Sequence, residues 1–184
     1  MGVRVSVESA SKMIAAPERK VSDANGIILT PIDLAKEDPA LFGHFQLHEQ
    51  ARDAEVQAVS SWYRSGSGPA PTQGGVWVGG SILVPLAGQN PPANAITNSI
   101  DYTWDNTNLR GWDSQVSVRL IIQAGSNAWE ANVTAANVGS ISAAGANIPA
   151  NAQLQFQMRV GTLQVSLFNP PYISTNSVRV HYTY

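Results

Sequence analysis

Two tryptophans and the polar loop between them are the residues best suited to hold a ligand. Trp104 and Trp112 flank a loop that carries Asp105 and is followed by Asp113. An indole ring can stack on a sugar ring, while carboxylates accept hydrogen bonds from its hydroxyl groups. Large aromatic rings serve equally well in a core or a subunit interface. Two interpretations therefore stay open. Trp104, Asp105, Trp112 and Asp113 form a ligand platform, or the tryptophans pack in the core or in a subunit interface.

Metal sites find little support in the residue spacing. The acids around residues 101–113 lack the Asp-x-Asp-x-Asn-Gly order and the closing glutamate of a calcium-binding EF-hand loop. His44 and His48 are four residues apart and would share one face of a helix, but the His-Glu-x-x-His order of zinc proteases is absent. We therefore expect neither a metal nor any other cofactor.

Catalytic motifs are also missing. The chain has no cysteine, which excludes a thiol nucleophile. The serines of 65–68 lack the Gly-x-Ser-x-Gly order of a hydrolase, and the glycine pairs at 74–75 and 79–80 are not followed by a phosphate-loop lysine. The sequence predicts a protein that is not an enzyme.

The charges are unevenly distributed along the chain. The formal net charge is −2 and the isoelectric point is about 5.9, so we expect no affinity for nucleic acid. No apolar run is long enough for a membrane span. All three lysines precede residue 37, and from Ser65 onward there are only four acids and four arginines. An ordinary domain has about a quarter of its residues charged. We therefore expect other protein to cover much of the exterior.

The C-terminal part of the sequence alternates between apolar and polar residues again and again. This period of two is typical of half-buried strands. It occurs in segments that are separated by Gly, Pro and Asn clusters: 96–104, 116–122, 154–160, 165–167 and 178–184. Two more strands are expected near 75–86 and 127–135, and a weaker one near 138–143. This pattern predicts an all-β fold, an antiparallel β-sandwich or jelly roll over residues 75–184.

The first 74 residues predict an extended N-terminal arm with one short helix. Asp38-Pro39 is a helix start, and the helix is expected to end near Arg52, with an extended segment to Tyr63. Residues 65–71 have the composition of a flexible linker. We expect this arm to make the binding and assembly contacts through six apolar residues: Val3, Val5, Val7, Phe42, Phe45 and Trp62.

Uncharged amides form the polar rows of the predicted strands. Gln153, Gln155, Gln157 and Gln164 occupy the positions where a sheet exposed to solvent usually carries lysine or glutamate. We interpret this row as a face that packs against copies of the chain or against a larger shell. Such contacts would leave a sheet edge open, to which the segment Val3–Val7 of a partner could add as a strand.

The layout of the whole chain resembles tailed-phage virion proteins, in particular capsid decoration (cement) proteins. The alternating Val/Gln strands, the Ala/Asn/Ser-rich loops, the lysine-poor body and the extended start carry the resemblance. It implies a location in the virion, homo-oligomers (a trimer by preference) and binding to capsid or other virion proteins. The alternative is a carbohydrate-binding module or a receptor-binding fibre domain.

Overall fold

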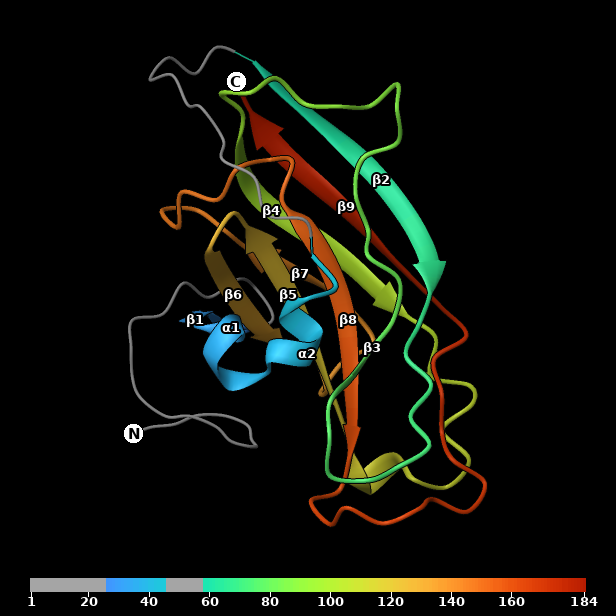
Figure 1. Ribbon diagram of the computed structural model, residues 1–184. Coiled ribbons are helices and arrows are strands. Elements are labelled where there is room, and N and C mark those ends of the chain that lie inside the picture. The colour runs from blue at the N-terminus through green and yellow to red at the C-terminus, as the bar shows by residue number, and fades with distance from the viewer. Residues whose placement is uncertain (1–25, 46–57) are drawn as a thin grey trace.

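The computed structural model describes residues 26–45 and 58–184, which form two antiparallel sheets packed face to face (Figure 1). The strands of the first sheet are, in spatial order, β1 (Leu29–Ile32), β6 (Asn127–Asn132), β5 (Val116–Ala124), β8 (Gln153–Val160) and β3 (Val78–Gly79). Those of the second are β2 (Val59–Ser67), β9 (Thr175–Thr183), β4 (Ile96–Trp104) and β7 (Val138–Ser142). The prediction of an all-β sandwich is confirmed.

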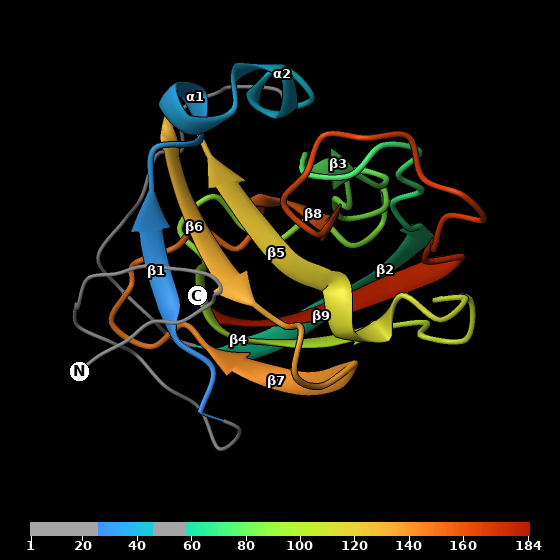
Figure 2. The same cartoon turned by 90° about the horizontal axis from the view of Figure 1, so that it is seen from below.

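The main core lies between the two sheets, as Figure 2 shows from below. Alternate residues of the central strands point inward, so that Leu120 of β5 lies opposite Phe156 of β8 and both are fully buried. From the other sheet, Tyr102 of β4 packs on Phe156, with the ring centroids 6.5 Å apart. The alternation at 96–104, 116–122, 154–160 and 178–184 therefore predicted these core faces correctly.

The N-terminal part of the described chain belongs to the sandwich. β1 pairs with β6, with Leu29 opposite Ala131, and β2 pairs with β9 over nine residues. The expected boundary at residue 74 therefore does not separate an arm from a body. The predicted linker at 65–71 is wrong in its first half, because Ser65–Ser67 still pair with β9. Backbone hydrogen bonds of the sheet hold these small residues in place.

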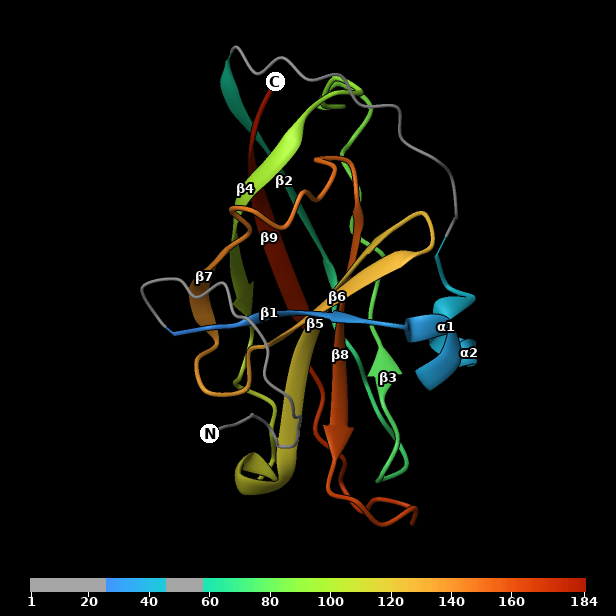
Figure 3. The same ribbon diagram turned by 90° about the vertical axis from the view of Figure 1, so that its left-hand side faces the viewer.

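Two short helices lie on the outer face of the five-stranded sheet (Figure 3). They are α1 (Leu34–Glu37) and α2 (Pro39–Phe42). The predicted helix start is confirmed, because Asp38 caps α2 and its Oδ1 accepts a hydrogen bond from the Leu41 amide at 3.2 Å. α2 ends after one turn at Gly43. The expected continuation of the helix to about Arg52 falls on residues 46–57, which lie outside the described residues.

Three of the six residues expected to make assembly contacts lie in the described part of the chain. Phe45 is buried and Phe42 half-buried in a small cluster with Leu34, Ile121 and Ala128 on the outer face of the sheet. Trp62 is fully buried in the main core. The prediction that Phe45 and Trp62 face a partner is wrong, because helix packing and strand pairing bury them. Phe42 is half-buried, and its part in assembly stays a prediction. Val3, Val5 and Val7 lie outside the described residues.

Candidate functional site

Three large apolar side chains are exposed together at one end of the sandwich. Leu163, Val165 and Phe168 are 72%, 53% and 89% exposed, and they lie in the loop that follows β8. We call residues 163–168 the apolar tip; in Figure 1 it lies at the lower end of the molecule, beyond the end of β8. Exposed apolar patches mark sites of interaction, and this loop gathers three of the exposed large apolar residues within six positions, which makes it the candidate site.

Backbone hydrogen bonds from a second segment fix the conformation of the apolar tip. The Gly74 amide donates to the Val165 carbonyl at 2.8 Å, and the Leu167 amide donates to the Thr72 carbonyl at 3.0 Å. Glycine is needed for this approach, since a Cβ on Gly74 would lie 2.6 Å from the Leu163 carbonyl oxygen. The three apolar side chains are therefore presented by an anchored backbone.

The loop before β5 forms a polar rim next to the apolar tip. Arg110 donates from Nη1 to the Asn169 side chain at 3.1 Å, and its guanidinium lies 5.0 Å from the centre of the Tyr172 ring. Trp112 is half-buried and donates from Nε1 to the Asn169 carbonyl at 3.0 Å. Arg110 and Asn169 both have positive φ, 55° and 50°. Such strained residues are concentrated at sites of binding and catalysis.

The structure does not form the tryptophan platform that the sequence suggested. Trp104 is buried in the main core, 4% exposed, and donates from Nε1 to the Val133 carbonyl at 3.1 Å. Packing is therefore the role of Trp104, because it continues the inward face of β4. Trp112 lies at the rim of the apolar tip, and Asp113 is exposed at the start of the 3-10 helix η1 (Asp113–Gln115).

Asp105 caps its own loop. Its Oδ1 accepts hydrogen bonds from the Thr107 amide at 3.1 Å and from the Thr107 hydroxyl at 2.8 Å, and its Oδ2 accepts one from the Ser174 hydroxyl. The hydrogen bond from Ser174, followed by those from Thr107, lowers the pKa of Asp105 below its ordinary value. This arrangement ties the loop to the start of β9.

We expect Asp105→Asn to lower the free energy of unfolding by about 1 kcal/mol near neutral pH, since it removes charge-assisted hydrogen bonds. The lowered pKa contributes stability above the pKa of the unfolded chain, about 3.9. That contribution is lost as the pH falls through the folded value. The difference in free energy of unfolding between the unmodified protein and Asp105→Asn should therefore shrink as the pH falls from neutral to acidic. Urea unfolding of both proteins measures this difference. Asp113→Asn is the control, and equal losses in both variants would contradict this role for Asp105.

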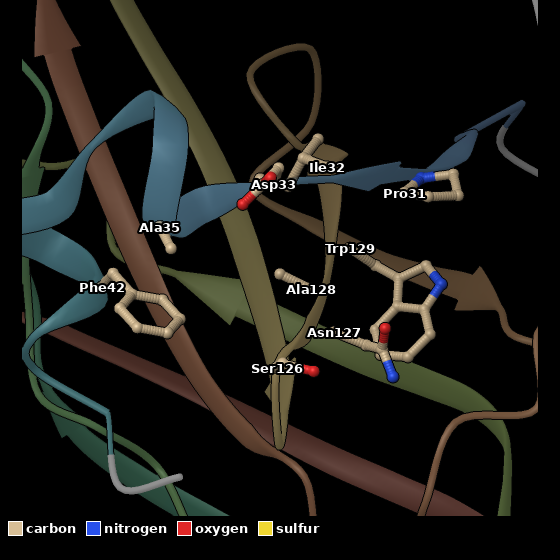
Figure 4. Close-up of a pocket in the computed structure, with 9 residues that line it drawn as sticks. All are labelled: Pro31, Ile32, Asp33, Ala35, Phe42, Ser126, Asn127, Ala128 and Trp129. Atoms are coloured by element: carbon tan, nitrogen blue, oxygen red, sulfur yellow. The ribbon is translucent and has the colours of Figure 1, made fainter.

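A shallow groove of about 590 Å³ lies between β1, the two helices and the turn from β5 to β6 (Figure 4). Figure 4 shows Phe42 and Ala35 on one side of the groove and Trp129 and Asn127 on the other. Asp33 is the one ionisable residue that lines it, and its Oδ1 accepts a hydrogen bond from the Lys36 amide. Among the described residues that line the groove, Asp33 is therefore the only one that could accept or donate a proton near neutral pH.

Neither a metal centre nor a membrane span is found in the described part of the chain. Across residues 26–45 and 58–184, no group of three or more His, Asp or Glu side chains is placed to hold a metal ion. His44 contacts Gln155, and His48 lies outside the described residues. None of the described helices has the length or the apolar run that a transmembrane helix requires.

The fold is similar to that of a protein of known structure. The crystal structure of FlhE aligns with a TM-score of 0.54 and 20% sequence identity, and the alignment covers 70% of this chain and all of the FlhE chain. At that identity the similarity shows the fold alone. No family model matches the sequence, and no curated protein matches it.

The hypothesis of a capsid decoration protein is wrong. The structure that the chain is similar to is FlhE, which is not a phage protein. The described residues before position 74 also do not form a free arm, because β1, β2 and both helices pack on their own sandwich. The glutamine row was expected to face other chains, but the chain itself buries Gln153, Gln155 and Gln157 of β8, and of this row only Gln164 is exposed.

The sequence did not reveal the apolar tip. Val165 and Leu167 were expected to form a strand, since they alternate with Gln164 and Ser166. In the structure this stretch makes only an isolated bridge, between Ser166 and Gln73. Gly161, whose φ is 61°, turns the chain out of β8. The glycine before the alternation and Asn-Pro-Pro after it were the available signals of a loop.

Proposed function

We propose that this chain is a non-enzymatic binding domain that docks onto another protein through the apolar tip. The observation that carries the proposal is Phe168, which is 89% exposed on a loop whose backbone is hydrogen-bonded to a neighbouring segment. Burying a phenylalanine side chain stabilises a complex by about 1.5–3 kcal/mol. With Leu163 and Val165 beside it, the tip offers a compact set of anchors for an apolar pocket of a partner.

The surroundings of the apolar tip favour a protein as its ligand. Protein interfaces combine an apolar centre with a polar rim, and arginine and aromatic residues are enriched in them. Arg110, Trp112 and Asn169 supply such a rim. An anionic membrane surface is attracted by clusters of four to eight basic residues. The loop that forms the rim has no such cluster. It carries one arginine, Arg110, and is followed by one aspartate, Asp113, so there is no excess of positive charge.

The test is site-specific photo-crosslinking in the cell that makes the protein. A benzophenone amino acid at position 168 should give a discrete adduct, while the same group at position 138 should give none. Val138 is a matched control, because it is also an exposed apolar residue, 60% exposed, but lies on β7. Adding Leu163→Ser should weaken the adduct at 168 at least tenfold, since it removes a second anchor.

Two further measurements separate the possible ligands of the apolar tip. Homo-oligomerisation stays a prediction, and sedimentation velocity of the purified chain, with and without Phe168→Ser, tests whether the partner is a second copy. Because Phe168 is exposed, this change should leave the melting temperature within about 2 °C. Equal adducts at 168 and 138 would contradict the proposal. Vesicle binding that Phe168→Ser abolishes would reassign the tip to a membrane.

A further inference from the structure

A row of three hydrogen bonds crosses the outer face of β5 and β8. Arg119 donates from Nε to Gln157 Oε1 at 2.8 Å, and Gln157 donates from Nε2 to Gln155 Oε1 at 2.8 Å. The next contact joins Gln155 Nε2 to His44 Nδ1 at 2.9 Å. Arg119, Gln155 and Gln157 are at most 4% exposed, whereas His44 is exposed. The row therefore begins in the sheet and ends on residues 33–45, the segment with both helices, which we call the strap.

The direction of each hydrogen bond in this row is fixed. A guanidinium can only donate, so the carbonyl group of Gln157 must face Arg119 and its amide must face Gln155. The other N–H of Gln155 donates to the Gly80 carbonyl at 2.9 Å, and a carbonyl can only accept. Gln155 cannot turn over without losing both contacts. His44 Nδ1 must therefore accept, which requires a neutral ring with its proton on Nε2.

We propose that His44 is an acid-sensitive latch that holds the strap on the sheet when neutral and releases it when protonated. A proton taken from solvent onto Nδ1 places an N–H of His44 against an N–H of Gln155. The hydrogen bond is then lost, and the buried amide of Gln155 lacks one acceptor, a loss that costs about tenfold or more in an equilibrium constant.

The strap can open without unfolding of the sandwich. Its apolar contacts form a small cluster that is separate from the main core: Leu34 and Phe45 of the strap pack on Ile121 and Ala128 of the sheet. Segments with few buried contacts open locally at a lower free energy than the whole domain. Release of the strap would uncover Ile121 and the side of Gln155 that faces His44.

Several other charged groups surround the strap in the described part of the chain, and one of them, Glu37, acts against a release by acid. They are Asp33, Lys36, Glu37 and Asp38 of the strap, Arg119 of β5, Glu130 of β6 and Arg159 of β8. Burial, and then Glu130, raise the pKa of Glu37 above its ordinary value. A raised folded pKa favours the closed strap at low pH, and this contribution is lost as the pH rises. Protonation of Glu37 therefore favours the closed strap, which is the opposite of the effect proposed for His44.

A single reporter cysteine measures the opening, because the chain has none of its own. Ala128→Cys places a thiol beneath the strap, where Ala128 is 4% exposed, and Ala40→Cys gives an exposed reference on α2. The ratio of their labelling rates at each pH removes the pH dependence of the thiol itself. We expect this ratio to rise about tenfold between about pH 7.5 and about pH 5.

Two comparisons decide whether the latch is responsible. His44→Gln should abolish the rise, because its amide oxygen can accept from Gln155 and takes up no proton in this range. The inference is overturned if the ratio is constant with pH, or if His44→Gln shows the same rise. A cysteine at Ala143, in the main core, should stay protected at both pH values. Parallel exposure at Ala143 would mean unfolding of the whole domain and would also overturn it.

Discussion

Replacement of Trp62 by alanine is expected to lower the free energy of unfolding by about 3–5 kcal/mol. The side chain is fully buried between the two sheets, although β2 is an edge strand of its sheet. Its Nε1 donates to the Ala150 carbonyl at 2.7 Å. The substitution therefore leaves a large cavity and a buried carbonyl without its donor. Urea unfolding of the purified chain measures the loss directly.

Two controls separate the cavity from the hydrogen bond at this position. Trp62→Phe keeps an aromatic ring but leaves the Ala150 carbonyl without a donor, so its loss should be smaller, about 1–3 kcal/mol. Tyr63→Ala removes the next side chain, which is 41% exposed, and should cost less than about 1 kcal/mol. If Trp62→Ala has the same free energy of unfolding as the unmodified chain, the side chain does not stabilise the core. Trp62 would then be an assembly contact, as the sequence analysis predicted.

The contrast between β2 and its neighbour β9 shows how much of the fold the sequence could predict. β9 buries every second side chain, among them Val178, Val180 and Tyr182, so its alternation is visible in the sequence. β2 buries Trp62 alone, and its Ser-Gly-Ser end has the composition of a linker. Its pairing is decided by backbone bonds to a strand 118 residues away, Trp62 to Val180. Periodicity cannot reveal such a strand, because it carries too few buried residues.

The candidate site was harder to predict than the fold. Exposure decides which apolar residues can bind, and Leu163, Val165 and Leu167 have the same spacing as the core residues of a strand. Only the tertiary contacts show that Leu167 packs on the core while Leu163 and Val165 do not. For the glutamines of β8 the error was the opposite one, because buried side chains were expected to be exposed. Their polarity suggested an open face, but a buried amide is tolerated when its hydrogen bonds are satisfied.

Replacement of Arg119 by alanine should have the second large effect, about 3 kcal/mol of lost stability. The buried guanidinium donates from Nη1 to Glu130 Oε2 at 3.1 Å and from Nε to Gln157, and it lies 4.1 Å from the centre of the Trp77 ring. Alanine leaves Gln157 Oε1 without this donor and Glu130 without its counterion. The side chain of Glu130 is 30% exposed, so solvent reduces that penalty.

Arg159 supplies the matched control for this prediction. Its guanidinium also lies over the Trp77 ring, 4.8 Å from the ring centre, but Arg159 is only half-buried. Burial and the neighbouring Arg119 lower the pKa of Arg159, so removing it relieves a repulsion and Arg159→Ala should cost less than about 1 kcal/mol. Both variants are compared by urea unfolding.

Because Arg119 also fixes the direction of the glutamine row, Arg119→Ala should weaken the pH dependence of strap opening, whereas Arg159→Ala should preserve it. Equal losses of stability in the two variants, with the pH dependence intact in both, would show that cation–π packing matters here and that the hydrogen-bonded row does not.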